Sequence, residues 1–582
     1  MNEFINELKG MFSKCKNNIL KTFLAFYSYW AILKITGINN YSIFLLFGLI
    51  GVLVLFYKVE INNTVKKPSI LVAVVFSLLI SVGNVVIGAM GTNNLNIFNL
   101  NVIFNIAVNA LGLYFFFYYF FNLFFSKVKK INLLVKNKRE HPNKIFFGSW
   151  LLIFVAWIPY FLRFFPGILT NDSRLQLQYI EEGFFDNHHP FVHTWFEGGI
   201  YNLGKILFNN TNLAMSMVTI VQMIILSAIF AYAVRFLYKH KFNSLIVIIV
   251  LLLYAFMPQF SVYSVTLWKD ILFGGACLLL LISIVEMTLQ DKFEKGTFII
   301  FIIAFLMMLF FRNNGVYVLL LCTPFFLYCF RSKLKIMLIT IISLFAFYFI
   351  VTGPIYKTIN VRESSSVETY GMMLQHVGRV IASGDEIDYK NEKYLKTLFD
   401  FDTIKNVYKP YLIDPVKNNM NREEFDKTKG QFYLTWLSLF LKHPDTYIEA
   451  TLSQTAGYWY PSVKYWTTPP ISYENTYGVH SKSLVPSKVE HAIDWIRSID
   501  LTYASLYWGI GLGFMILFIS IITCSIRGIN KNKYFAWFIP FVGIWATMMI
   551  ASPVFAEYRY VYGLFTSMPI LILIPFIIKN KS

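Results

Sequence analysis

Long apolar segments alternate with short polar ones along most of this chain of 582 residues. Stretches such as SLIVIIVLLLYAF, from Ser244, and FIIFIIAFLMMLFF, from Phe298, carry no charge. Each approaches the roughly 20 residues that a helix needs to cross a hydrocarbon core of about 30 Å. The pattern predicts an all-α polytopic membrane protein with about fourteen transmembrane helices. We expect them near residues 22–37, 41–57, 69–90, 102–125, 145–165, 212–236, 243–259, 271–289, 297–311, 315–330, 336–352, 503–525, 534–551 and 562–578.

The composition indicates a lipid bilayer as the main surroundings. Hydrophobic residues make up 56% of the chain and aromatic residues 18%, which excludes a soluble globular protein. The net charge of +19 lies in short clusters between apolar segments, not on one basic face, so we expect no nucleic-acid partner. The five cysteines avoid the polar segment 355–500, so no disulfide framework is expected there.

The basic clusters also predict how the chain crosses the membrane. If the N-terminus is cytoplasmic, every basic loop is cytoplasmic, and the alternate loops, such as GTNNLNIFNLN, are almost free of basic residues. This predicts a multi-pass protein of the bacterial cell membrane with cytoplasmic N- and C-termini. No small-residue cleavage site follows the N-terminus, so we expect no cleavable signal peptide. The clusters are Lys9–Lys21, Lys127–Lys144, Arg235–Lys241, Lys292–Lys295, Arg331–Lys335, Arg527–Lys533 and Lys579–Lys581.

We predict four regions along the chain. They are an N-terminal membrane region of four spans, a membrane core with a first outer loop, an extracytoplasmic domain and a C-terminal membrane region of three spans. The third is too polar for a membrane and too rich in aromatic residues for disorder, and GQFYLTWLSLFLK within it, from Gly430, has helical spacing. The regions cover residues 1–144, 145–352 (outer loop 166–211), 353–502 and 503–582.

The first outer loop holds an unusual concentration of polar side chains, TNDSRLQLQYIEEGFFDNHHPFVHTWFEGG, between Thr170 and Gly199. Ionisable groups at a membrane are costly and often functional. Asp172 lies in Asn171–Ser173, where we expect the N-cap of a helix, so it is either a cap or a carboxylate that serves as a general base. The two roles are compatible only if the carboxylate oxygen that does not accept backbone N–H groups faces the cleft.

The second half of this loop is rich in histidine. His188 and His189 precede Pro190, which favours the first turn of a helix. On that helix His189, His193 and Glu197 would share one stripe, with spacing suited to a divalent metal. The same stripe could bind phosphate through histidine N–H groups, or pack without a ligand, so we expect no required cofactor.

Cations are rare in the predicted outer loops, and three of them stand out. Lys269 precedes Asp270, Arg312 precedes Asn313, and Arg559 follows Glu557 and Tyr558. Each could neutralise an adjacent acid or reach lipid headgroups. Gathered beside Asp172 and the histidines, they would instead bind an anionic, phosphate-bearing ligand.

These features resemble the GT-C superfamily of integral-membrane glycosyltransferases, which includes protein mannosyltransferases, the aminoarabinose transferase of lipid A and oligosaccharyltransferases. The likeness covers about residues 145–580 and rests on a span followed by a large outer loop that opens with an acid, here Asp172. The His188–Pro190 and Arg312–Gly315 elements are similar to those of an uncharacterised bacterial branch. The chain departs from the family in its four preceding spans, its inserted soluble segment and the lack of a paired acid, since Ser173 follows Asp172.

The resemblance implies an inverting enzyme of the hexosyltransferase type that uses a polyprenyl-phosphate-linked sugar. Asp172 would be the catalytic base, and Arg559, Lys269 and Arg312 would bind the donor phosphate. His188, His189, His193, Glu197, Asp270, Asn313, Glu557 and Tyr558 would contribute to substrate binding. The acceptor would be a cell-envelope glycan or a polymer of the teichoic-acid type. The alternatives are a polymerase or ligase of lipid-linked glycans, and a flippase or transporter of an anionic or lipid-linked substrate.

Overall fold

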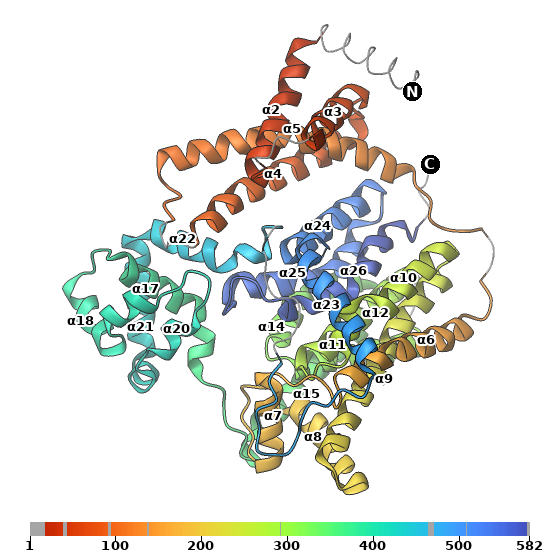
Figure 1. Cartoon of the computed structure of the whole chain (residues 1–582), viewed down its shortest axis with the longest axis vertical. Coiled ribbons are helices and arrows are strands. Elements are labelled where there is room, and N and C mark those ends of the chain that lie inside the picture. The colour runs from red at the N-terminus through yellow and green to blue at the C-terminus, as the bar shows by residue number, and fades with distance from the viewer. Residues whose placement is uncertain are drawn as a thin grey trace.

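The computed structural model describes residues 18–578 apart from 39–42, 91–94, 137–138, 291–292, 462, 464–470 and 508. Over this part the chain is helical, and its extended pairings are isolated β-bridges (Figure 1). The predicted all-α class is therefore confirmed. Some members of the basic clusters, and one cysteine, lie outside the described residues. They are Lys9, Lys14, Lys16, Lys292, Lys579–Lys581 and Cys15.

The N-terminal helices pack mainly with one another. α2 (Ile19–Thr36), α3 (Ile43–Lys58), α4 (Lys66–Ala89) and α5 (Leu100–Lys130) form the red and orange group at the top of Figure 1. α5 packs along both α2 and α4. It ends in a lysine-rich turn, where positive charge favours a helix C-terminus. This group reaches the other helices through α24 (Ile510–Ile526) and, at α4, through α22 (Pro444–Thr455).

α12 (Lys269–Gln290) is the almost fully buried centre of the remaining helices. It packs against α9, α13, α25 and α26. Its contact with α26 is close, because a Cβ atom at Gly563 would lie 2.7 Å from Sγ of Cys277. This contact brings the first turns of α12 and α26 together. The helices of this core are α6 (Pro142–Arg163), α9 (Thr211–Lys239), α10 (Ser244–Phe256), α11 (Pro258–Ser264), α13 (Lys295–Phe311), α14 (Gly315–Cys329), α15 (Leu334–Ile350), α25 (Lys531–Ala551) and α26 (Tyr562–Leu573).

Within the described residues, eight helices are long and apolar enough to span a membrane, or nine if one bent pair is counted as a span. Four further apolar helices are shorter. The multi-pass membrane architecture follows from these helices. A helix lies at each of the fourteen predicted spans, but α2, at the first of them, is in neither group, so the number fourteen stays a prediction.

Two predicted spans differ from the structure at their ends. The predicted span 243–259 is broken, because α10 ends at Phe256 and α11 starts at Pro258 with a bend of 49°. Proline restricts the residue before it and supplies no N–H, which accounts for a break at this position. The predicted span 503–525 begins later, since α23 ends at Tyr507 and α24 starts at Ile510.

A group of short helices, drawn in green and cyan at the left of Figure 1, has a hydrophobic core of its own. We call residues 367–447 the helical domain. Its core is built from residues such as Leu374, Leu395 and Phe432. Short helices of this kind depend on capping, and Asp388, Asp400 and Asn421 cap three of them. The helices are α17 (Gly371–Ser383), α18 (Tyr389–Leu398), α19 (Phe401–Val407), α20 (Asp414–Asn418) and α21 (Arg422–Lys442), and α22 (Pro444–Thr455) leads back to the membrane core.

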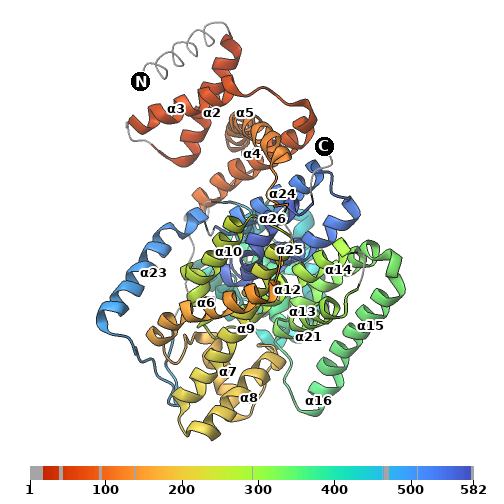
Figure 2. The ribbon, with the colours of Figure 1, turned by 90° about the vertical axis from the view of Figure 1, so that its right-hand side faces the viewer.

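The first loop of the core is helical too, and α7 (Asn171–Glu182) and α8 (Phe191–Phe208) lie at the bottom of Figure 2. An extended segment, 471–486, runs across the residues that lead into α7. The amides of Ser472, Lys482 and Leu484 donate to the carbonyls of Leu169, Phe165 and Leu162. The segment continues into α23 (Ser487–Tyr507), where Asp494 binds Arg163 of α6 at 2.8 Å. The start of α7 is thus fixed by residues about 300 positions later.

Candidate functional site

The N-terminus of α7 is capped by Thr170, not by the predicted Asn171–Ser173. Oγ1 of Thr170 accepts from the amide of Ser173, and Oγ of Ser173 accepts from the amide of Thr170, which completes a capping box. Ser173 also donates to the carbonyl of Leu267 at 2.5 Å. Asp172 is the second residue of the helix, and the capping leaves its carboxylate available for other contacts.

A short backbone pairing places the start of α12 next to α7. Ile168 and Thr266 form a parallel bridge, with Ile168 donating to Val265 and Leu267 donating to Ile168. Gln222 of α9 supports this strand-like segment from behind by donating to the carbonyl of Thr266 at 2.8 Å. Because Trp268 follows directly, its indole Nε1–H reaches Oγ1 of Thr170 at 2.5 Å. Lys269 then begins α12 at the side of Asp172.

Asp172 is the centre of a cluster of charges from three distant parts of the chain. Nη1 of Arg559 donates to its Oδ2 at 2.6 Å, and Nζ of Lys269 lies 3.7 Å from the same oxygen. No described residue makes a hydrogen bond to Oδ1. The Arg559 guanidinium also lies over the Trp268 ring, 5.0 Å from its centre. The side chain of Asp172 is 26% exposed, so its free oxygen is within reach of a ligand.

The charge on Asp172 is set by these cations. Burial alone would raise the pKa of this carboxyl, but Lys269 and Arg559 outweigh burial and hold the pKa well below its ordinary value. The carboxylate is therefore ionised at any physiological pH. A ligand anion that competes for the two cations would weaken their hold and make the carboxylate more basic.

Arg312 joins the cluster from the turn between α13 and α14. Its Nε lies 3.3 Å from Oδ1 of Asp270, its Nη1 donates to the carbonyl of Tyr560 at 2.5 Å, and its guanidinium covers the Tyr560 ring. Neither oxygen of the Asp270 carboxylate accepts a hydrogen bond from a described residue, although the side chain is fully buried. A buried carboxylate in this condition is costly. Arg312 thus lies at ion-pair distance from Asp270 but does not form a hydrogen bond with it.

The two adjacent histidines have different surroundings. Nδ1 of His189 accepts from the Lys269 ammonium at 2.9 Å, which leaves the proton of the neutral ring on Nε2. That Nε2 is buried and has no hydrogen-bond partner among the described residues. Burial, with Lys269 nearby, lowers the pKa of His189 to about 2, and burial lowers the pKa of His188 too. His189 is therefore a neutral N–H donor beside the cations. The turn that precedes it is held by Asn313, which donates to the carbonyl of Asn187 at 2.8 Å.

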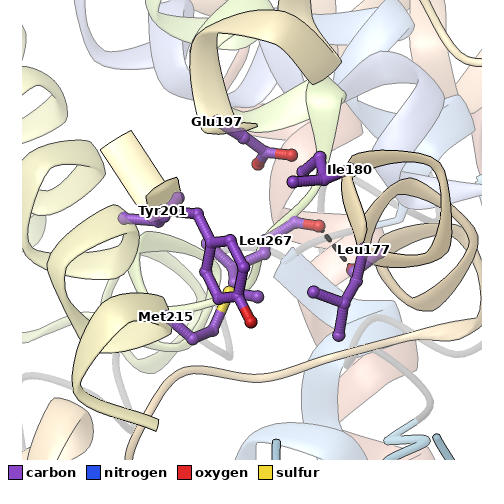
Figure 3. Close-up of a pocket in the computed structure, with 8 residues that line it drawn as sticks. Leu177, Ile180, Glu197, Tyr201, Met215 and Leu267 are labelled. Atoms are coloured by element: carbon purple, nitrogen blue, oxygen red, sulfur yellow. Dashed lines mark hydrogen bonds between the residues drawn. The ribbon is translucent and has the colours of Figure 1, made fainter. Parts of the chain in front are cut away.

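His193 and Glu197 lie deeper, on α8. Nδ1 of His193 lies 3.1 Å from Nε2 of Gln176 and 3.7 Å from Oε2 of Glu197. Burial lowers the pKa of His193 to about 3 and raises the pKa of Glu197 to about 8, so both are neutral at pH 7. Glu197 faces a small apolar pocket, and its carboxyl group lies above Ile180 and Tyr201 in Figure 3. The other residues around the pocket are Ser173, Leu177, Met215, Val218 and Leu267.

The predicted stripe of three ligands is only partly formed. His193 and Glu197 share a face of α8, whereas His189 precedes the helix and is engaged by Lys269. Over the described ranges, no group of three His, Cys, Asp or Glu side chains is arranged to hold a metal ion. A metal at His189, His193 and Glu197 stays a prediction.

Glu557 and Tyr558 complete the set of predicted residues. Glu557 lies 3.6 Å from Nε of Arg559, and burial raises its pKa to about 7. Tyr558 is buried against Tyr263 and Phe565, away from the exposed side of Asp172. Glu557 therefore adjoins the cluster, and Tyr558 supports it from behind.

Sequence analysis did not single out four residues that build this site. Trp268, Tyr560, Thr170 and Gln176 all contact predicted residues. Trp268 and Tyr560 are direct neighbours of Lys269 and Arg559, so rings next to rare outer cations are a signal that could have identified them.

Comparisons with known proteins place the chain in a family but assign no activity. A family model with the description "Family of unknown function (DUF6020)" matches residues 177–581. The match includes the histidines, Lys269, Arg312 and Arg559, and it begins shortly after Asp172. No curated protein and no solved structure matches the chain.

Proposed function

The chain belongs to the family of unknown function DUF6020, and we propose that it is a membrane glycosyltransferase of the GT-C type. It moves a hexose from a polyprenyl-phosphate donor to a cell-envelope acceptor on the outer face, in a membrane body of about fourteen spans. The observation that carries the proposal is the Asp172 carboxylate, which has Oδ2 held by Arg559 and Lys269 and Oδ1 free. A base and a phosphate site are then adjacent.

The donor phosphate would bind where the cations meet. Lys269 and Arg559 supply positive charge, and the unpaired Nε2–H of His189 supplies a neutral donor. Arg312 is connected to these cations by its hydrogen bond to the carbonyl of Tyr560, the residue that follows Arg559. Because the Nε2–H of His189 has no partner among the described residues, a phosphate would satisfy a donor that is costly to leave buried and unpaired.

Donor binding would also activate the base. A phosphate that draws Lys269 and Arg559 away from Asp172 removes the charges that depress its pKa. The carboxylate then accepts the proton of an acceptor hydroxyl while the hydroxyl oxygen attacks the anomeric carbon. The bond from that carbon to the phosphate oxygen breaks, and its electron pair leaves with the polyprenyl phosphate. The cations stabilise the charge that grows on the departing phosphate.

The test is transfer by the purified full chain in proteoliposomes. A synthetic polyprenyl-phosphate hexose and a saccharide acceptor are supplied, and release of polyprenyl phosphate is measured. We expect Asp172→Asn to lower the rate by about 10²- to 10⁴-fold, the usual contribution of a general base. Glu181→Gln is the matched control, because Glu181 lies on the same helix but pairs with Lys205 and Tyr201.

Two outcomes would reject this proposal. Full activity of Asp172→Asn would remove Asp172 from the chemical step. Movement of labelled lipid across the bilayer by the wild type without release of polyprenyl phosphate would identify a flippase. The envelope glycan composition of a deletion strain would then distinguish a transferase of one sugar from a polymerase or ligase, because only the first loses a single sugar.

A further inference from the structure

The second half of α21 has an apolar face that the helical domain does not cover. Thr428 has non-helical backbone angles and separates this half from the first turns. On one side, Phe432 and Leu439 are buried in the core of the domain. On another side, Leu434 is 66% exposed and Leu441 is 74% exposed. The helix is therefore apolar on two faces, and only one of them is needed for folding.

The exposed side chains form a continuous stripe. At about 100° per residue, five exposed apolar side chains fall within an arc of roughly 120°. The polar residues Gln431 and Ser438 and the charged residue Lys442 lie outside the arc, and Lys429 lies at one edge. Single exposed apolar residues are ordinary, but a continuous patch marks an interaction surface. The stripe consists of Tyr433, Leu434, Leu437, Phe440 and Leu441.

The stripe continues onto α22 and from there to the membrane spans. Ile448 of α22 is exposed, and Leu452, one turn later, packs with Val86 near the end of α4. Between them, Glu449 accepts from the amide of Ile97, in the connection between α4 and α5, at 2.9 Å. α4 and α5 are both candidate spans, so their connection lies at a membrane surface. The helical domain is docked on that surface.

From this continuity we infer that the second half of α21 and the start of α22 lie in the interfacial layer of the bilayer, with the stripe among the lipids. Ring contacts along the helix, Tyr433 with Trp436 and Trp436 with Phe440, supply the aromatic groups that favour this layer. Lys429, at one edge of the stripe, can reach the headgroups. The helical domain is then held on the membrane as well as by its contact with α4. This inference does not depend on the proposed reaction.

Depth-dependent quenching tests the inference on the full chain. The native cysteines are replaced by serine, and a single cysteine at Leu437 or Leu441 carries an environment-sensitive dye. Gln431, exposed on the polar side of the same helix, is the control position. In liposomes with nitroxide-labelled phospholipid, we expect lipid quenching at least about twofold stronger at 437 and 441 than at 431, and the reverse order with aqueous iodide.

Because Leu437 and Leu441 are exposed, Leu437→Gln and Leu441→Gln should leave the unfolding midpoint in detergent unchanged. Dye at 437 and 441 that iodide reaches as readily as at 431 would overturn the inference. Dye that is protected from both quenchers would also overturn it, because a second protein copy or another part of the chain would then cover the stripe.

Discussion

The two ends of α12 both carry a buried carboxylate with basic neighbours, yet they differ in how completely those groups are satisfied. At the C-terminal end, Glu286 accepts from Lys239 at 3.0 Å and from Gln290 at 2.9 Å, with His240 at 3.2 Å. At the N-terminal end, the oxygens of the Asp270 carboxylate accept no hydrogen bond from any described residue. A buried carboxylate with both oxygens hydrogen-bonded serves the fold, whereas one without such partners, beside the partly exposed Asp172, indicates a place where a ligand can bind.

The strongest test of this contrast is the removal of Arg559. Arg559→Ala should lower the rate of sugar transfer by about 10²- to 10³-fold, as expected when a donor to a developing anion is lost. Arg559→Lys should recover part of the rate, because it restores the charge without the forked geometry. The measurement is release of polyprenyl phosphate at several donor concentrations. An unchanged rate in Arg559→Ala would show that the N-terminal end of α12 is as structural as the other end.

The opposite result is expected at Glu286. Glu286→Gln leaves Lys239 without its buried partner, and loss of one member of such a pair costs about 3 kcal/mol of folding free energy. The variant should unfold at a clearly lower temperature in detergent, while each folded molecule retains the wild-type rate. A thermal unfolding curve and an active-site titration separate the two quantities. A rate loss without loss of stability would contradict the assignment of Glu286 to the fold.

The pH dependence of donor binding should reveal Glu557. Its pKa is raised to about 7, so the side chain is mostly neutral below that pH and mostly charged above it. The new negative charge beside Arg559 weakens the attraction for phosphate by about 1 kcal/mol, so the donor KM should rise roughly fivefold between pH 6 and 8. Glu557→Gln should flatten that profile. Asp172 and His189 stay in one protonation state over this range, because their pKa values lie well below it.

A comparably small effect is expected at Trp268, which links Thr170 to Arg559. Trp268→Phe keeps an aromatic face under Arg559 and loses only the hydrogen bond to Thr170, at about 1 kcal/mol. Trp268→Leu also loses the cation–π contact, at about another 1 kcal/mol. Rates at saturating donor should fall in that order, with the pH profile unchanged. Equal rates in both variants would show that the ring does not position Arg559.

The sequence predicted the helices of the membrane body well, because their apolar segments are long and nearly uncharged. The sequence was less informative about helix ends, because several neighbouring residues could each serve as the cap. Thr170, Asn171, Asp172 and Ser173 are all good capping residues, and only the contact of Ser173 with Leu267 selects Thr170. In the helical domain the elements are too short for periodicity, except in α21, whose spacing predicted a helix.

The residues of the candidate site could be predicted from the sequence, because such charged residues are rare in the predicted outer loops. The contacts that these residues make could not be predicted. The pattern of basic loops predicted that Asp172, Lys269 and Arg559 lie on one side of the membrane. In the structure, the cationic groups of Lys269 and Arg559 lie within 3.7 Å of the same oxygen of Asp172. Of the predicted stripe from His189 to Glu197, the last two members lie on α8, whereas Lys269 binds His189 before the helix begins. Such a contact depends on the pairing of Ile168 with Thr266, which has no local pattern.

The ion pair between Asp172 and Arg559 joins residues separated by 387 positions. During synthesis, therefore, the acid and its strongest partner leave the ribosome far apart in time, with nearly all of the membrane body inserted between them. A nascent chain that has inserted only its earlier helices holds Asp172 without Arg559. Under the proposed function, the chain would become active only after α26 has docked, so an incomplete chain would not consume the lipid-linked donor.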